Sequence, residues 1–157
     1  ETPPTDRRVI AYEAAAKLAE FGMAAFPQLL AHRDDERQSV AFRRVSRHSV
    51  GLACYCIVED EIYNLPRDYR GSFYRTGGDG KDLERPYFMA PGIFSWDTVD
   101  AWLQERKGKS LPELQIEVLE WLIAQEESIG FASEQDRENT LGPLQRQVVR
   151  VRAQLDK

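Results

Sequence analysis

The side chains best suited to bind a metal or act as nucleophiles are His32 and His48 together with Cys54 and Cys56. Cysteine and histidine are the usual zinc ligands, and a structural zinc site needs four such donors that converge. The two cysteines lie two residues apart on a predicted helix, about 200° around its axis, so they point to different sides. We therefore expect no metal and interpret both cysteines as small apolar residues without a redox role.

Three other patterns fall short of known catalytic or binding motifs. A Ser-His-Asp arrangement can be drawn with His48, but no Gly-x-Ser-x-Gly elbow marks a nucleophile. The acidic residues Asp79, Asp82 and Glu84 are too few for an EF-hand, which also needs a final glutamate. The glycine-rich run 77–80 lacks the Lys-Ser or Lys-Thr pair of a phosphate-binding loop and is typical of a turn. The residues therefore predict no catalytic site and no cofactor.

Composition narrows the class of protein. The chain has 157 residues, of which 42% are hydrophobic and 30% charged, as expected for a single globular domain over residues 1–157. Its formal net charge of -5 argues against nucleic acid as a partner, because phosphate-backbone binders are basic. No run of about eighteen apolar residues is present, so we expect a soluble chain without a membrane span.

Apolar residues at helical spacing predict an all-α fold of paired helices, either HEAT-like or an irregular bundle. Start signals include Ser49, Ser95 and the capping box Ser110-Leu111-Pro112-Glu113, while Gly22 marks a stop. The predicted helices span residues 6–21, 24–32, 50–65, 96–107, 111–128 and 141–155. We expect one buried core that contains Ile10, Leu18, Leu29, Cys54, Val58, Trp96, Leu103, Leu114, Val118, Leu122 and Val148.

Residues 64–95 differ from the rest, since glycines and prolines interrupt any helical period while aromatic residues persist. So long a connection is typical of a functional loop packed by its own aromatics. We expect an ordered loop that contains a short β-hairpin around residues 77–80, with an exposed tip at residues 76–82. Four aromatic residues should be buried and hold it in place: Tyr69, Phe73, Tyr87 and Phe88.

Charge is distributed unevenly along the chain. Residues 111–140 hold eight acidic residues and one basic residue, so this segment has a net charge of −7. Such a run is usually a solvated face, although charge polarity also speeds association with a partner. Two basic clusters oppose it: Arg43, Arg44 and Arg47 before the third predicted helix, and Arg146, Arg150 and Arg152 on the last one.

The stretch from Ala16 to Asp35, AKLAEFGMAAFPQLLAHRDD, resembles the start of a HEAT repeat. In that family a helix ends in a Leu-Gly-like pair, and a second helix with an early proline leads to an Asp-rich turn. The resemblance extends over about residues 12–61. It implies stacked helix pairs, which usually serve as protein-binding scaffolds.

The chain begins at Glu1 and continues Thr2-Pro3-Pro4-Thr5, without an initiating methionine. A polar, proline-containing start of this kind is typical of a mature terminus left by a signal peptidase, and equally of a trimmed chain. We interpret residues 1–5 as a flexible spacer, and we favour export, to the periplasm or outside the cell, over the cytoplasm.

These observations predict a non-enzymatic helical domain that binds another protein through the 64–95 loop and an adjoining helical face. The alternative is a small exported inhibitor or immunity-type protein whose 64–95 loop blocks an enzyme. The predicted partner-binding residues are Arg43, Arg44, Arg47, Tyr74, Arg75 and Asp79.

Overall fold

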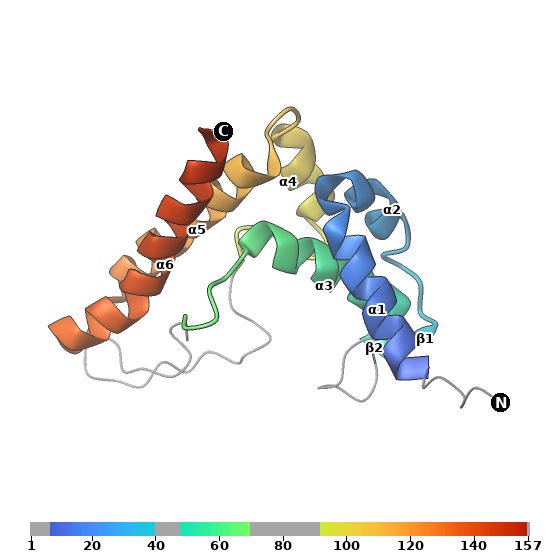
Figure 1. Ribbon diagram of the computed structural model, residues 1–157, viewed down its shortest axis with the longest axis horizontal. Coiled ribbons are helices and arrows are strands. Elements are labelled where there is room, and N and C mark those ends of the chain that lie inside the picture. Colours follow the sequence, from blue (N-terminus) through green and yellow to red (C-terminus); the bar gives the residue numbers. More distant parts are fainter. Residues whose placement is uncertain (1–6, 40–47, 70–91, 157) are drawn as a thin grey trace. The chain divides into compact units, whose positions relative to one another are not determined.

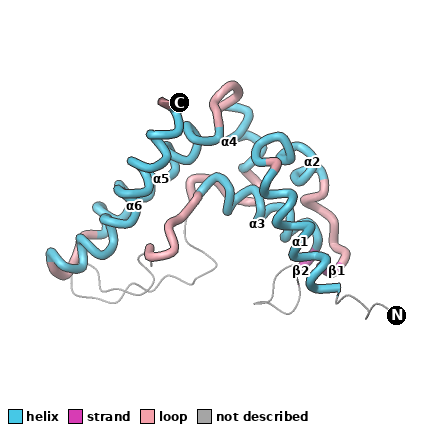
Figure 2. Tube along the Cα trace, viewed as in Figure 1, coloured by secondary structure: helices cyan, strands magenta, loops and turns pink. Residues whose placement is uncertain are grey.

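The computed structural model describes residues 7–39, 48–69 and 92–156. Within these ranges the chain forms six α-helices, one 3-10 helix and one pair of two-residue strands (Figures 1 and 2), so the predicted all-α fold is confirmed. None of the described helices combines the length and the apolar character needed to cross a membrane. The chain divides into two compact units, Glu1–Ile62 and Tyr63–Lys157, which we describe separately.

The first unit begins with α1 (Arg7–Glu20), a short 3-10 helix (Gly22–Ala25) and α2 (Phe26–Ala31). Gly22 adopts φ 52°, the left-handed conformation that ends a helix, as its position in the sequence predicts. Pro27 lies in the first turn of α2, where its missing N–H removes no helical hydrogen bond.

A strand pair that the sequence did not predict precedes the third helix. The strand β1 (Gln38–Ser39) pairs antiparallel with β2 (His48–Ser49), and α3 (Val50–Tyr63) follows immediately. The predicted cap at Ser49 is confirmed, because its hydroxyl accepts a hydrogen bond from the backbone N–H of Leu52 at 3.0 Å. Two-residue strands are too short to give an alternating apolar–polar pattern, so they cannot be predicted from the sequence.

The start of α3 is fastened to the turn that follows α2. The backbone N–H of Val50 donates to the carbonyl of Arg37 at 2.7 Å, and that of Gly51 donates to Asp35 at 2.9 Å. At Gly51 an added Cβ would lie 1.8 Å from the carbonyl oxygen of Arg33, far inside van der Waals contact. Only glycine allows the two backbone segments to approach this closely.

The same turn contains a local ion pair between Asp35 and Arg37. The Arg37 Nε donates to both carboxylate oxygens, at 2.9 Å to Oδ1 and 3.0 Å to Oδ2, and the Arg37 backbone N–H donates to Oδ1 at 3.0 Å. These bonds favour the charged carboxylate, and they lower the pKa of Asp35 from 3.8 to about 2.

We expect the Asp35 carboxyl to titrate near pH 2 in the folded chain, measured by NMR of its carboxyl carbon. Because the folded pKa lies below the unfolded one, the contact stabilises the native state above pH 3.8, and this contribution is lost as the pH falls towards about 2. Arg37→Gln should return the midpoint towards 3.8, whereas Arg33→Gln should not change it. An unchanged midpoint in Arg37→Gln would contradict this explanation.

The second unit contains α4 (Val99–Glu105), α5 (Leu111–Ile129) and α6 (Glu134–Leu155). The helices α5 and α6 run antiparallel and side by side (Figure 1), joined by the four residues 130–133. The two helices pack through a buried core of Leu119, Leu144, Val148 and Val151. Four half-buried residues pack against this core, namely Tyr69, Ile116, Leu122 and Ile123.

The predicted boundaries of α5 are confirmed by its capping contacts. Ser110 and Glu113 form the capping box, in which the Ser110 backbone N–H donates to Glu113 Oε2 at 2.6 Å. At the other end, Gly130 adopts φ 79° directly after Ile129. Both ends therefore follow from local sequence signals.

Several other boundaries differ from the prediction. The helix α6 begins at Glu134 rather than Leu141. Gly142 and Pro143 lie within it, and because such residues usually interrupt helices, the sequence predicts a later start. Its cap is Ser133, whose hydroxyl accepts from the Asp136 N–H at 3.1 Å. The helix α4 begins at Val99, and α3 ends at Tyr63 rather than at residue 65.

Most of the predicted core residues are sheltered from solvent. Six are buried, namely Leu29, Cys54, Val58, Leu114, Val118 and Val148. Four are half-buried, namely Leu18, Trp96, Leu103 and Leu122, while the side chain of Ile10 lies outside the described part. On α4 the buried positions are Val99 and Trp102 rather than the expected Leu103, so the inward face of this helix differs from the prediction.

Only the two ends of the 64–95 segment are described, and its second end is packed by aromatic rings. Phe94 lies between Tyr63, in an edge-to-face contact with centroids 5.5 Å apart, and Trp102, at 4.9 Å. The Ile93 N–H donates to the Tyr63 hydroxyl at 3.0 Å. The expected hairpin at 77–80, the tip at 76–82 and the burial of Phe73, Tyr87 and Phe88 lie outside the described residues.

Candidate functional site

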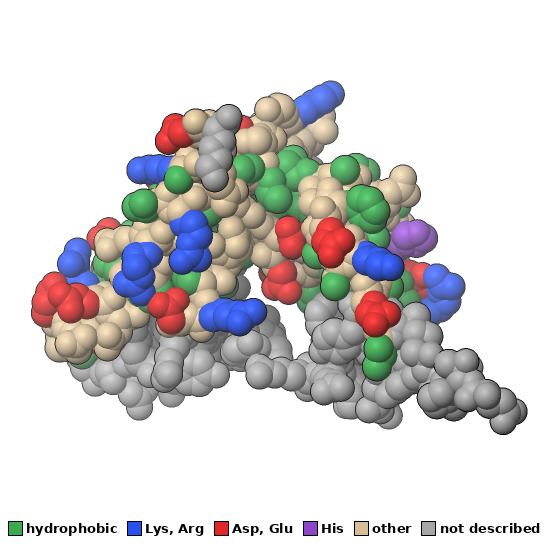
Figure 3. All heavy atoms as spheres, in the orientation of Figure 1, with side chains coloured by type: hydrophobic (Ala, Val, Ile, Leu, Met, Phe, Trp, Pro, Cys, Tyr) green, Lys and Arg blue, Asp and Glu red, His purple; other side chains and the backbone are tan. Residues whose placement is uncertain are grey.

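A pocket in the second unit lies between residues 64–68, which follow α3, and one face of α6. Its volume is about 370 Å³, and the α6 side chains that line it are Pro143, Arg146, Gln147 and Arg150. We call it the arginine pocket, because Arg67 on the 64–68 segment completes a set of three guanidinium groups. Figure 3 shows blue Lys and Arg side chains gathered over α6.

The 64–68 wall of the pocket is shaped by an abrupt end of α3. Asn64 adopts φ 45°, a left-handed conformation that asparagine tolerates better than most residues and that stops a helix. Pro66 follows, and its carbonyl accepts from the Tyr69 N–H at 3.0 Å, which closes a turn. Beyond the turn, the Tyr69 hydroxyl donates to the buried Glu126 at 2.5 Å and so ties the segment to α5.

A buried glutamine joins the two walls. The Gln147 side chain, on a residue only 6% exposed, donates through Nε2 to the Asn64 carbonyl at 3.0 Å. Its Oε1 accepts from Arg150 Nη1, also at 3.0 Å. One amide therefore fixes the backbone of the 64–68 wall and orients a guanidinium of the opposite wall.

The electrostatics of the arginine pocket are uneven, with three guanidinium groups and one carboxylate. Arg146 Nη2 donates to Asp68 Oδ2 at 2.8 Å, an exposed pair that spans the two walls. Arg150 is bonded to a neutral amide, and Arg67 makes no ion pair with any residue of the described ranges. Within the described ranges, Arg67 and Arg150 therefore leave two positive charges without a counterion, in a chain whose net charge is -5.

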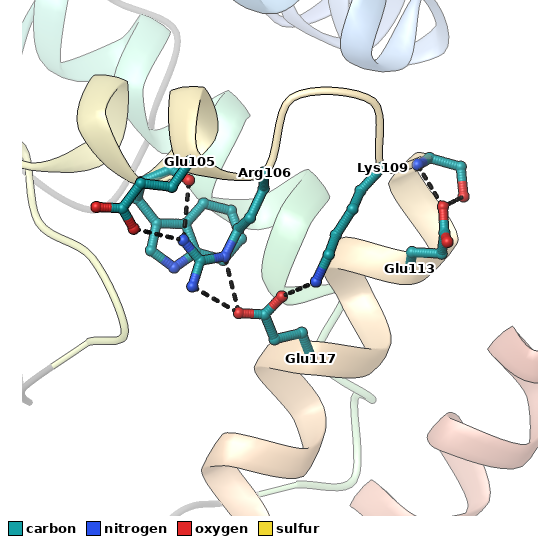
Figure 4. Close-up of polar contacts among 7 residues, drawn as sticks. Glu105, Arg106, Lys109, Glu113 and Glu117 are labelled. Carbon is teal, nitrogen blue, oxygen red and sulfur yellow. Dashed lines mark hydrogen bonds and ion pairs between the residues drawn. The ribbon is translucent and has the colours of Figure 1, made fainter.

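A second charged cluster, which joins α4 to α5, is fully compensated (Figure 4). Glu117 accepts from Arg106 Nε at 2.7 Å and from Lys109 Nζ at 2.6 Å. A second carboxylate, Glu105, accepts from Arg106 Nη1 at 3.1 Å, so that two anions balance two cations. The Arg106 guanidinium also lies 4.3 Å from the ring centroid of Trp102, a cation–π contact, and donates to the Trp102 carbonyl at 3.0 Å. Burial alone would raise the pKa of Glu117, but these hydrogen bonds outweigh it and lower the pKa. This cluster stabilises the α4–α5 corner and presents no free charge.

The acidic run of residues 111–140 is therefore less solvated than the sequence suggests. Glu126 is only 3% exposed, Glu117 bridges two cations, and Glu120 pairs with Arg152 of α6. The predicted basic face of α6 therefore has two parts: Arg152 pairs with Glu120 outside the arginine pocket, whereas Arg146 and Arg150 line the pocket.

None of the predicted partner-binding residues is among the described residues that line this pocket, and none can be compared with it. Arg43, Arg44 and Arg47, and likewise Tyr74, Arg75 and Asp79, lie outside the described residues. The inhibitor alternative depends on the last three, so it stays a prediction.

The predicted absence of a metal site also concerns only part of the chain. Among the described side chains, no three of the His, Cys, Asp and Glu type come together in a way that could hold an ion. Cys54 is buried and Cys56 half-buried, and both are free. Burial, with smaller contributions from the nearby Glu59 and Asp60, raises the pKa of Cys56 to about 12, and burial also raises the pKa of Cys54.

Both thiols should consequently be slow to alkylate in the folded chain. The thiolate is the reacting species, and at pH 8 a group with a pKa of about 12 is almost entirely protonated. We expect iodoacetamide to modify neither cysteine at pH 8, and to modify both rapidly in denaturant, as measured by mass spectrometry. Rapid labelling of Cys56 in the native chain would contradict the raised pKa.

The sequence places Arg146 and Arg150 on a basic face of the last helix, but neither is among the predicted partner-binding residues, and Arg67 and Gln147 are not singled out at all. The spacing of Arg146 and Arg150 by four residues places them on one helix face, which is readable from the sequence. At the other wall, Asn64 followed by Pro66 indicates the end of a helix. Because Leu65 between them continues the apolar spacing of the helix, the predicted helix extends to residue 65. Nothing local indicates that Arg67 meets α6.

No protein-family model, no curated protein and no solved structure matches this chain. The HEAT-like character of residues 12–61 accordingly stays an expectation.

Proposed function

We propose that this chain is a non-enzymatic domain that binds another protein through the arginine pocket and the adjoining face of α6. The observation that supports this most directly is the charge of the pocket, which holds three guanidinium groups and one carboxylate. Cations without counterions contribute little to folding, whereas they speed and orient the association of a complementary partner.

The chemistry of the pocket favours recognition over catalysis. A guanidinium group offers only N–H donors and no acceptor atom, so Arg67, Arg146 and Arg150 offer no atom that could take a proton from a substrate. The one carboxylate, Asp68, is occupied by Arg146 at 2.8 Å. Planar guanidinium groups are instead suited to binding carboxylates through paired hydrogen bonds.

The pocket is also held rigidly, as a binding surface should be. Leu144 and Val148 of α6 are buried against α5, while Arg146 and Arg150 face the pocket from the same helix. Gln147, between them, is hydrogen-bonded to both walls. A preorganised surface loses less conformational entropy when a partner binds.

Site-specific photo-crosslinking in the source organism tests this proposal. A photoreactive residue at Leu65, which lines the pocket and is 45% exposed, should capture a defined protein, and one at the exposed Gln28 of α2 should not. The captured protein, once purified, should bind the purified chain in calorimetry. Identical capture at both positions, or no binding by the purified protein, would overturn the proposal.

A further inference from the structure

We infer that the arginine pocket takes an acidic peptide segment, with Arg67 and Arg150 each binding a carboxylate of that segment. This inference rests on the proposed function and names the chemistry of the partner at the same site. It goes beyond protein binding in general, because it assigns the affinity to two particular guanidinium groups.

The pocket already holds one carboxylate in the expected manner. Asp68 belongs to one wall, and its Oδ2 accepts from Arg146 Nη2 of the other wall at 2.8 Å. This pair demonstrates that an arginine of α6 can reach a carboxylate within the pocket. Arg67 and Arg150 lack such a carboxylate among the described residues, so two equivalent positions are open.

The neutral side chain of Gln147 already orients Arg150 for this role. A long arginine side chain normally loses rotamer freedom when it binds, which opposes association. Here Gln147 Oε1 already accepts from Arg150 Nη1 at 3.0 Å, and Gln147 is itself held by the Asn64 carbonyl. The remaining N–H groups of the guanidinium stay available for a carboxylate, because arginine carries five donors.

Apolar residues beside the pocket favour a peptide over a free phosphate. Leu65 lines the pocket and is 45% exposed. Val149 is 69% exposed and follows Arg146 by three residues, which places both on one face of α6. A small inorganic anion gains nothing from exposed apolar side chains, whereas an acidic peptide with interspersed apolar residues can cover them.

The arrangement also predicts an effect of the built-in carboxylate. Asp68 competes with an incoming carboxylate for Arg146, and both side chains of this pair are exposed, at 62% and 65%. An exposed pair of this kind contributes little to stability, so its loss should leave the fold intact. Asp68→Asn should therefore strengthen peptide binding severalfold by releasing a third guanidinium.

The test uses the full chain and two fluorescein-labelled peptides, one alternating glutamate with leucine and one alternating glutamine with leucine. We expect fluorescence anisotropy to detect binding of the acidic peptide alone. Arg67→Gln and Arg150→Gln should each weaken it about tenfold, the usual loss for a charge-assisted hydrogen bond. Arg152→Gln is the matched control, since it removes the same charge from α6 at a residue paired with Glu120 outside the pocket.

Every other outcome counts against the inference. Equal weakening by Arg152→Gln would reveal nonspecific attraction, and displacement of the peptide by millimolar inorganic phosphate would reassign the pocket to phosphate. Failure of the acidic peptide to bind a chain whose melting temperature is normal would also overturn it.

Failure of this inference can be distinguished from failure of the proposed function. If the crosslinked protein binds with an affinity that Arg67→Gln and Arg150→Gln leave unchanged, the proposed function stands and this inference fails. If the acidic peptide binds as expected but no protein is captured at Leu65, the proposed function fails.

Discussion

Replacing Leu144 by alanine should lower the free energy of unfolding by about 2 to 5 kcal/mol, the range for a large aliphatic side chain removed from a packed core. Leu144 is fully buried and contributes to the core cluster with Leu119, Val148 and Val151. The substitution removes apolar contacts and leaves a cavity that the two helices, fixed by their other contacts, cannot close completely. Urea denaturation followed by circular dichroism measures the change.

The matched control for Leu144→Ala is Val149→Ala on the same helix. Val149 is 69% exposed, so the truncation removes little buried surface and should change the stability by less than about 0.5 kcal/mol. The comparison tests the rotation of α6 about its axis. Equal unfolding midpoints for the two variants would mean that α6 presents a different face to α5.

The second large effect is expected at Gly51, where alanine should destabilise the chain by about 2 to 4 kcal/mol through overpacking and lost hydrogen bonds. The new Cβ would lie 1.8 Å from the Arg33 carbonyl oxygen and 2.6 Å from its carbon. Both are backbone atoms, so no side-chain rotation relieves the contact. Moving the backbones apart would break the bond from the Gly51 N–H to the Asp35 carbonyl, now 2.9 Å long.

Gly142→Ala provides the control, because Gly142 also lies in a helix but its added Cβ would meet only a side chain that can move aside. Its nearest potential contact is the far end of the flexible Arg146 side chain, 3.1 Å from the added Cβ. Alanine is better than glycine within a helix by up to about 1 kcal/mol, so this variant should be neutral or more stable. Thermal melts would contradict the close approach at Gly51 if both variants shifted in the same direction.

The parts of the fold that the sequence predicts well are those governed by neighbouring residues. The start of α5 follows from Ser110 and Glu113, and the end of α1 follows from Gly22. The predicted start of α6 at Leu141 is wrong, because the helix is capped by Ser133 and continues through Gly142 and Pro143, two residues that usually interrupt helices. The packing of α5 and α6 evidently outweighs the hydrogen bond that Pro143 cannot donate.

The candidate site depends much more on contacts between distant segments. Helical spacing places Arg146 and Arg150 together, but only the folded chain brings Arg67 and Asp68 to them. Gln147 looks like one more polar residue of a surface helix, and its burial depends on the Asn64 carbonyl. Such pairings have no local sequence signature, because the residues that make them are each ordinary in their own segment.

The Gln147 hydrogen bond to Asn64 spans 83 residues of sequence, which has a consequence for the order of folding. Neighbouring helices such as α5 and α6 close a short loop and form quickly, whereas contacts between distant residues wait for a larger loss of chain entropy. We therefore expect the two helices to pair before the arginine pocket exists. In stopped-flow refolding, the helical signal should recover first and the capacity to bind the acidic peptide later, so that binding reports the completed second unit rather than its first collapsed form.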